Sequence, residues 1–178
     1  YNSVYARDKF SFHLQPFEID SLDDYSGAGL SFAGTFQSAG IFPIFDDTLR
    51  IQEDYSLGFS RKTPEDGFTI YNGKGRYYND IFLSNDGLKG NGNFEYLTAK
   101  ASAKDIIFFP DSMNLNTQLF SIEEVSEGIE FPQVKNTQTY IHFEPYKERL
   151  YIYKKLDNFS LYQSQVELDG DLVMRPTG

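Results

Sequence analysis

The stretch Leu88-Lys89-Gly90-Asn91-Gly92-Asn93-Phe94 decides the fold class of this chain. Residues two apart in a β-strand point to the same face, so Leu88, both glycines and Phe94 share one apolar face. The lysine and the two asparagines between them form a polar face. A strand with this alternation is buried on one side and solvated on the other, which is typical of an antiparallel sheet with one covered face.

The same pattern of apolar residues and glycine at every second position occurs four times. The copies are Leu30-Phe32-Gly34-Phe36, Tyr71-Gly73-Gly75-Tyr77, Leu88-Gly90-Gly92-Phe94 and Val166-Leu168-Gly170-Leu172. Their starting points are irregularly spaced, whereas a regular solenoid has a fixed period. We predict an all-β antiparallel sheet protein, either a sandwich or a solenoid-like stack with repeated glycine-containing strands, forming one domain over residues 1–178.

Alternation of apolar and polar residues continues over most of the chain. It predicts strands at residues 10–14, 30–36, 49–51, 55–59, 68–77, 81–83, 88–98, 105–109, 119–122, 137–144, 150–153, 159–162 and 166–174. Asn85-Asp86-Gly87 supplies the residue types that a tight hairpin needs. Helical periodicity is poor, and the best helical candidates are residues 101–106 and 121–127.

Glycine on an apolar strand face has two interpretations. In the favoured one, neighbouring rings such as Tyr71, Tyr77 and Phe94 pack onto the flat glycine positions. In the other, the face is a groove for a ligand or a partner strand. The candidate contact residues on this face are Tyr71, Gly73, Gly75, Tyr77, Leu88, Gly90, Gly92 and Phe94.

Composition excludes several classes of function. The chain has 178 residues, 17 Phe and 13 Tyr, and a formal net charge of -10. Binding to nucleic acid or to an anionic membrane needs clustered basic residues, and the longest basic runs here are Arg61-Lys62 and Lys154-Lys155. Cysteine is absent, so we expect neither disulfides nor thiolate metal sites. No stretch approaches the roughly 18 apolar residues of a membrane-spanning helix.

The ends of the sequence suggest a segment of a longer polypeptide or a processed product.

No sequence motif of a known catalytic machinery is present. His13 and His142 each alternate with apolar neighbours, which predicts surface or cross-strand roles. The adjacent or nearly adjacent acidic pairs give only a weak signal for a carboxylate hydrolase, because neighbouring strand residues point to opposite faces. These pairs are Asp23/Asp24, Asp46/Asp47, Glu53/Asp54, Glu65/Asp66, Glu123/Glu124 and Asp169/Asp171. We expect a non-enzymatic protein.

Two binding functions stay open as alternatives. Calcium prefers clustered oxygen ligands, and Asp169 and Asp171, on either side of Gly170, are the candidate metal ligands. No other cofactor is expected. Glycans stack on exposed aromatic rings, and the candidates are Tyr77-Tyr78 and the pair Tyr151/Tyr153, although the absence of Trp disfavours this function. The alternative function is therefore a glycan- or calcium-dependent binding module.

Four motifs within about residues 29–113 resemble those of a known group of proteins. They are Ser38-Ala39-Gly40-Ile41-Phe42-Pro43, the two glycine-rich runs at 68–77 and 83–92, and Phe108-Phe109-Pro110-Asp111-Ser112-Met113. The chain resembles long, repeat-rich, all-β cell-envelope proteins of Bacteroidota, a group with no assigned activity. The resemblance implies an exported location, in the envelope or outside the cell, and a longer parent. We therefore expect a structural or protein-interaction segment, with a protein or neighbouring segments of its own chain as partners.

Overall fold

The computed structural model describes residues 10–16, 31–123, 134–136, 138–155, 159–161 and 166–176. Apart from one turn of 3-10 helix, η2 (Pro145–Lys147), all regular structure in these residues is β-strand. Neighbouring strands pair antiparallel throughout, as for β6 with β7 and β8 with β9. The prediction of an all-β antiparallel sheet protein is therefore confirmed.

The strands differ widely in length. They are β1 (Ser11–Leu14), β2 (Ser31–Gln37), β3 (Phe45–Ile51), β4 (Leu57–Lys62), β5 (Phe68–Ile70), β6 (Gly75–Ser84), β7 (Gly87–Tyr96), β8 (Ala99–Phe108), β9 (Met113–Ile122), β10 (Val134–Asn136), β11 (Thr139–Glu144), β12 (Arg149–Lys154), β13 (Phe159–Leu161), β14 (Val166–Leu168) and β15 (Leu172–Met174). The four longest, β6 to β9, have 10 residues each and form the middle of the sheet.

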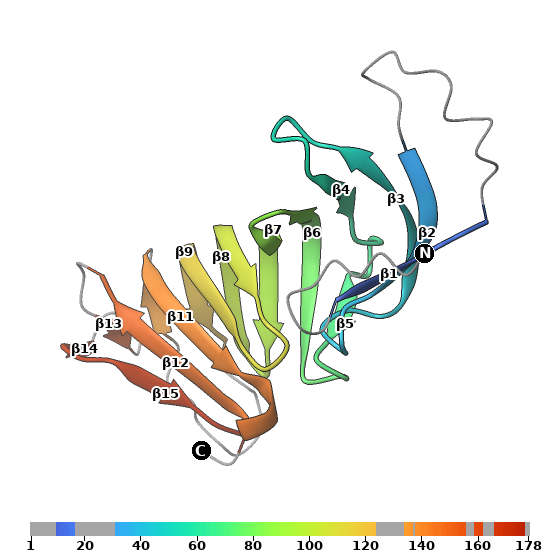
Figure 1. Cartoon of the computed structure of the whole chain (residues 1–178). Helices are drawn as coiled ribbons and strands as arrows, with labels where there is room; N and C mark the ends of the chain where they lie inside the picture. The colour runs from blue at the N-terminus through green and yellow to red at the C-terminus, as the bar shows by residue number, and fades with distance from the viewer. Residues whose placement is uncertain are drawn as a thin grey trace.

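The strands form one sheet that largely follows the chain as a meander. Its path is β1-β2-β3-β4-β6-β7-β8-β9-β10-β13-β14, with β5 beside β6, β11 between β9 and β12, and β15 beside β12. β10 and β11 pair with successive parts of β9 without a shift in register: Val134 pairs with Ile122, and Tyr140 pairs with Asn116. The sheet curls as it proceeds (Figure 1), so one face turns inward and the single sheet forms a half-barrel.

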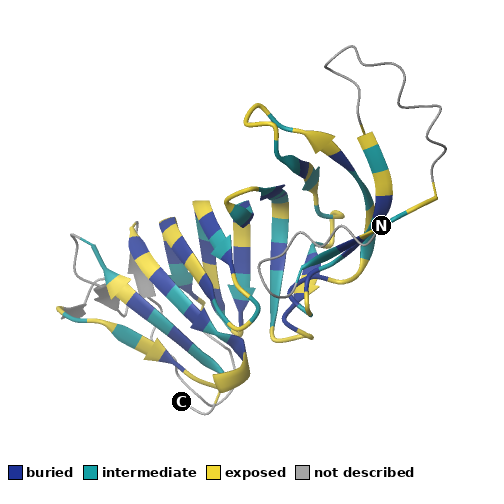
Figure 2. Ribbon diagram, viewed as in Figure 1, coloured by how far each residue is buried: buried dark blue, intermediate teal, exposed yellow. Residues whose placement is uncertain are grey.

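Alternation along β7 places the core on one face of this sheet. Leu88, Gly90, Gly92, Phe94 and Tyr96 are buried, and the residues between them are half-buried or exposed. Figure 2 shows the same banding on the neighbouring strands. The core side of β8 is lined by small residues in its first half, because Ala99, Ala101 and Ala103 occupy the buried positions. Because every second residue points to the same side, these buried positions together form one covered face of the sheet.

The glycines on the core face make room for aromatic rings of the next strand. A Cβ atom on Gly90 would lie 2.5 Å from the Tyr77 hydroxyl oxygen, and one on Gly75 would lie 2.9 Å from the Phe94 ring. A Cβ atom on Gly92 would lie 1.9 Å from the carbonyl oxygen of Tyr78. This is the packing interpretation of the glycine pattern, with Tyr77 and Phe94 as the covering rings.

One predicted strand, residues 68–77, is wrong in its middle. β5 ends at Ile70, and residues 71–74 form a turn in which the Lys74 N–H donates to the Ile70 carbonyl at 3.0 Å. Tyr71, Asn72 and Gly73 have φ values of 51°, 55° and 90°. Asparagine and glycine adopt this left-handed conformation readily, so the Asn-Gly pair favours a turn over a continued strand. Gly73 consequently does not lie on a strand face.

Two further expectations need correction. The predicted strand 166–174 is two short strands, β14 and β15, and Gly170 lies in the bend between them with no atom within 4 Å of a Cβ position. Residues 101–106, a helical candidate, lie within β8, because alanines two apart alternate with polar residues there. Of the other helical candidate, Ser121 and Ile122 belong to β9 and residues 124–127 lie outside the described part of the chain.

Tyr71 joins three turns at one end of the sheet. Its hydroxyl lies 2.8 Å from the Phe109 carbonyl oxygen and 2.6 Å from the Ser112 carbonyl oxygen, so its single proton is shared between two acceptors in the turn between β8 and β9. Its ring meets Phe143 and Tyr146 edge-on, with centroids 6.1 and 6.4 Å away. The β5–β6 turn is thereby tied to the end of the sheet where β8 meets β9 and β11 meets β12.

Candidate functional site

The residues predicted to contact a partner lie mostly inside the molecule. Tyr71 and Tyr77 are fully buried, and Leu88 and Phe94 are each 1 % exposed. Gly90 and Gly92 are covered by the Tyr77 ring, while Gly73 is exposed in its turn. The chain's own aromatic rings occupy this face, whereas the opposite face of the sheet is open to solvent.

Both histidines point away from the core, as the sequence predicts. His13 is exposed and lies 3.2 Å from the Ser11 hydroxyl. His142 Nδ1 lies 2.6 Å from Asn114 Oδ1, and its Nε2 lies 3.7 Å from a Glu144 carboxylate oxygen. The hydrogen bond from Lys147 and the nearby His142 both lower the pKa of Glu144, so its carboxylate is the stable form.

Three aspartates of the predicted acidic pairs, at positions 46, 47 and 54, serve local structure. Asp46 accepts a hydrogen bond from the Thr35 hydroxyl at 2.6 Å, and Asp47 lies 3.5 Å from the Arg61 guanidinium. Asp54 accepts from both the hydroxyl and the N–H of Ser56, and these hydrogen bonds lower its pKa. The pair Asp23/Asp24 and residue Glu124 lie outside the described residues.

The candidate calcium ligands both interact with one lysine. The Asp169 carboxylate forms an ion pair with the Lys154 ammonium group, and Asp171 Oδ1 accepts from the Lys154 backbone N–H at 3.3 Å. A cation binding here would have to displace that ammonium group. In the part of the chain that the structure describes, no group of three or more His, Asp or Glu side chains is placed to hold a metal ion.

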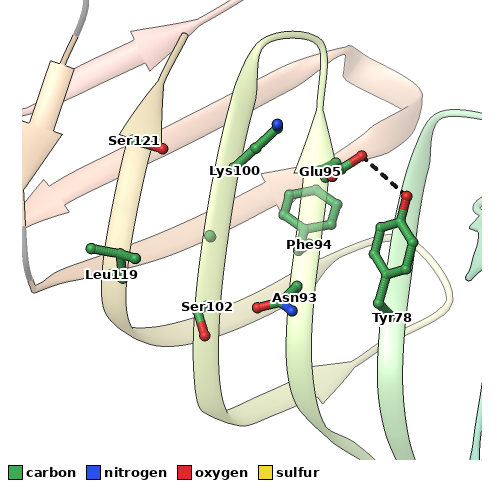
Figure 3. Close-up of a pocket in the computed structure, with 9 residues that line it drawn as sticks. Tyr78, Asn93, Phe94, Glu95, Lys100, Ser102, Leu119 and Ser121 are labelled. Carbon is green, nitrogen blue, oxygen red and sulfur yellow. Dashed lines mark hydrogen bonds between the residues drawn. The ribbon is translucent and has the colours of Figure 1, made fainter.

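A first shallow groove crosses the solvent face of β6, β7, β8 and β9 (Figure 3). It has a volume of about 380 Å³ and contains Tyr78, Glu95, Lys100 and Leu119. The Tyr78 hydroxyl lies 3.4 Å from a Glu95 carboxylate oxygen, and Lys100 forms a 2.8 Å ion pair with Glu123. That hydrogen bond to Glu123 raises the pKa of Lys100. The charged groups of this groove are thus already paired within the protein.

A second groove lies on the same face of the sheet, over β8, β9, β11 and β12. We call it the Tyr140 groove; it has a volume of about 290 Å³, and the side chains that form it include Asp105, Asn114, Asn116, Tyr140, His142 and Tyr153. Tyr140 stands directly opposite Tyr153 in the β11–β12 ladder, and opposite Asn116 in the β9–β11 ladder. Four neighbouring strands therefore contribute to one surface.

Tyrosine rings dominate one wall of the Tyr140 groove. Tyr140 is 51 % exposed and Tyr153 is 41 % exposed. Tyr151 precedes Tyr153 by two residues on the same face of β12, and their rings are parallel within 6° at a centroid distance of 6.4 Å. The Lys155 ammonium group lies 4.4 Å from the Tyr140 ring centroid and also contacts Asn116. These contacts give the groove an aromatic wall beside a row of polar side chains.

Sequence reasoning identified one residue that lines this groove, Tyr153, and its same-face neighbour Tyr151. Tyr151 and Tyr153 were predicted as stacking residues, and both lie on the solvent face. Of the other predicted pair, Tyr78 lines the first groove, but Tyr77 is buried and its hydroxyl donates to the Asp80 carbonyl at 2.5 Å. Tyr140 and Asn114 were missed, because only the pairing of β9, β11 and β12 brings them beside Tyr151 and Tyr153. Alternation marks Tyr140 as solvent-facing, but nothing local marks its partners.

Comparisons with known proteins identify no relative: no family model, curated protein or solved structure matches this chain. Among the described residues, no helix has the length and apolar character needed to cross a membrane.

Proposed function

We propose that this chain is a non-catalytic structural or protein-interaction segment of an exported envelope β-protein, and that it acts by pairing its open sheet edges with further β-strands. The observation that carries the proposal is the unclosed path of the sheet. Among the described strands, β1 pairs with β2 alone, while β14 and β15, at the other end, pair only with β13 and β12.

Strand addition is the mode of association that such edges offer. An edge strand presents unpaired N–H and C=O groups, and an incoming strand satisfies them while extending the ladder. At the β15 edge, Val173 is 49 % exposed and Met174 is buried, so the alternation of the core continues up to this edge. An added strand with the same alternation would extend both the ladder and the covered face.

The assignment as non-catalytic rests on how the reactive side chains are used. His142 is held between Asn114 and Glu144, and the described aspartates at positions 46, 47 and 54 are occupied by local hydrogen bonds or an ion pair. The envelope location is supported by the likeness of residues 29–113 to envelope proteins, and a chain without cysteine is compatible with export.

Hydrogen exchange on two forms of the protein tests the proposal. The native protein is purified from the cell envelope, and its exchange is compared with that of the isolated 178-residue chain. We expect the amides of residues 11–14 and 172–174 to exchange more slowly in the native protein, because added strands bond their outward-facing groups. The inner strands β8 and β9 are the matched control, with slow exchange in both forms.

The apparent mass of the native protein gives an independent check. An antibody against this segment is expected to detect a band well above 20.5 kDa in envelope fractions. Equal exchange at the edge strands in both forms, or a native band near 20.5 kDa in a cytoplasmic fraction, would contradict the proposal.

A further inference from the structure

We propose that the Tyr140 groove binds an oligosaccharide, which stacks on Tyr151 and Tyr153 and hydrogen-bonds to the polar side chains beside them. This inference does not depend on the sheet-edge function, because the groove lies on the solvent face of strands that are already paired. It needs only the isolated chain to be tested.

The arrangement of the rings favours a chain of sugars over a compact ligand. Tyr151 and Tyr153 lie two residues apart on one strand, with ring planes parallel within 6° and centroids 6.4 Å apart. A pyranose ring has a face rich in C–H groups that packs on an aromatic ring, and the linked rings of an oligosaccharide repeat that face. Two parallel aromatic rings two residues apart on one strand therefore offer packing surfaces to more than one sugar unit.

The polar side chains of the groove fit hydroxyl groups. Asn114 and Asn116 contribute amides, Asp105 an acceptor, and His142 an imidazole whose Nδ1 lies 2.6 Å from Asn114 Oδ1. Amides and imidazole offer both donors and acceptors, and sugar hydroxyls need both. Asn114 and His142 bond each other and Asn116 contacts Lys155, but an acyl chain would cover their remaining donors and acceptors without bonding them, which is costly. The Asp105 carboxylate also disfavours a phosphate at this position.

The groove is held in shape before any ligand arrives. Tyr140, Tyr151 and Tyr153 stand on strands whose backbones pair residue by residue, and Tyr140 is also held by the Lys155 ammonium group at 4.4 Å. Side chains that are already ordered lose little conformational entropy on binding. The exposure of Tyr140 and Tyr153, 51 % and 41 %, leaves much of their surface in contact with solvent.

Saturation-transfer NMR and calorimetry with three linear hexasaccharides test the inference: cellohexaose, chitohexaose and maltohexaose. We expect saturation to pass from tyrosine ring protons to sugar C–H protons for at least one of them. Tyr153→Ala and Tyr151→Ala are each expected to weaken that binding about tenfold or more, and Tyr153→Phe, which keeps the ring, by about threefold or less. Tyr55→Ala is the matched control, because Tyr55 is 89 % exposed and lies outside the groove.

Three results would overturn the inference. They are the absence of binding to all three hexasaccharides and to a broad glycan array, binding that survives the Tyr151→Ala/Tyr153→Ala double variant, and tyrosine-dependent binding to anionic lipid vesicles without saccharide binding. Thermal melting of each variant separates loss of binding from loss of fold. If Tyr153→Ala does not fold, the exposed Asn114→Ala variant carries the test, and unchanged affinity there would count against the site.

Discussion

The ring of Tyr77 lies over Gly90 of the neighbouring strand, so closely that a Cβ atom on Gly90 would stand 2.5 Å from the Tyr77 hydroxyl oxygen and 2.8 Å from the Phe108 ring. Gly90 and Gly92 of β7 thus form one packed unit with the rings of β6 and β8. Because Tyr77 and Phe108 are themselves buried, neither ring can withdraw into solvent to admit an added methyl group.

Gly90→Ala is therefore expected to destabilise the protein. Overpacking of this kind costs about 1–3 kcal/mol of unfolding free energy. Urea unfolding followed by circular dichroism measures the loss. Gly170→Ala is the matched control, because no atom lies within 4 Å of its Cβ position, and its effect should stay within about 0.5 kcal/mol.

The double variant Gly90→Ala/Tyr77→Phe locates the cause. Removing the Tyr77 hydroxyl removes the atom nearest the new methyl group, so the two substitutions should together cost less than the sum of their separate effects. Strict additivity would show that the clash lies elsewhere, with the Phe108 ring as the next candidate.

Tyr71→Phe is expected to lower stability at neutral pH, although it keeps the ring contacts. The Tyr71 hydroxyl bonds the carbonyl oxygens of both Phe109 and Ser112. Losing a buried donor that serves two acceptors costs about 1–3 kcal/mol. The control is Tyr55→Phe on an 89 % exposed ring, for which we expect no measurable change in the urea midpoint. Equal effects of the two substitutions would refute the role given to Tyr71.

Stability should fall as the pH rises above about 10. Burial raises the pKa values of Tyr71 and Tyr77 well above the ordinary value of 10.0. In the unfolded chain both phenols release their protons near pH 10, whereas in the folded protein they stay protonated. The stability they contribute is therefore complete below pH 10 and is lost above it, by about 1.4 kcal/mol per pH unit for each phenol.

Urea unfolding at pH 8, 9, 10 and 11 checks this dependence. The difference in stability between the natural protein and Tyr71→Phe should shrink as the pH rises, because the variant has one fewer buried phenol to ionise. A difference that stays constant up to pH 11 would show that Tyr71 ionises equally in the folded and unfolded states.

Thr117 and Thr139 are both buried, and replacing one is expected to leave more hydrogen-bonding groups without partners than replacing the other. Thr117 Oγ1 accepts from the Thr139 backbone N–H at 3.0 Å and lies 2.6 Å from Thr139 Oγ1. Thr117→Val leaves that N–H and the Thr139 hydroxyl without this partner, whereas Thr139→Val leaves the N–H bond intact. We expect Thr117→Val to cost about 1–3 kcal/mol and Thr139→Val clearly less. Thermal unfolding of both variants measures the order, and the reverse order would contradict this account.

The alternation of β7 was sufficient to predict its buried and solvated faces, because a strand has a side-chain period of two whatever its neighbours are. The hairpin at Asn85-Asp86-Gly87 was also correct: Gly87 has a φ of 105°, and Leu83 pairs with Leu88 across it. Alternation failed at Tyr71 because Tyr71-Asn72-Gly73-Lys74 carries both a strand pattern and a turn pattern. The Tyr71 hydroxyl reaches the Phe109 carbonyl oxygen, 38 residues later in the chain, from a turn and not from a continued strand.

The candidate site also contains a part that could be predicted from the sequence and a part that could not. Tyr151 and Tyr153 were recognisable as a same-face pair from their spacing, but the Tyr140 groove needs Tyr140 and Asn114 from two other strands. Strand order and register place those residues together, and single-strand periodicity carries no information about either. The exposed aromatic wall could therefore be anticipated, and the groove beside it could not.

The amino-acid sequence by itself determined the all-β class, the buried face of the central strands and the need for rings over the glycine positions, because each follows from the local period of two. Only the tertiary structure decided that the sheet curls as one meander, that the Tyr77 ring covers Gly90 and the Phe94 ring covers Gly75, and that Asn114, Tyr140 and Tyr153 share a groove. These features depend on register between strands, which is set by contacts summed over the whole sheet.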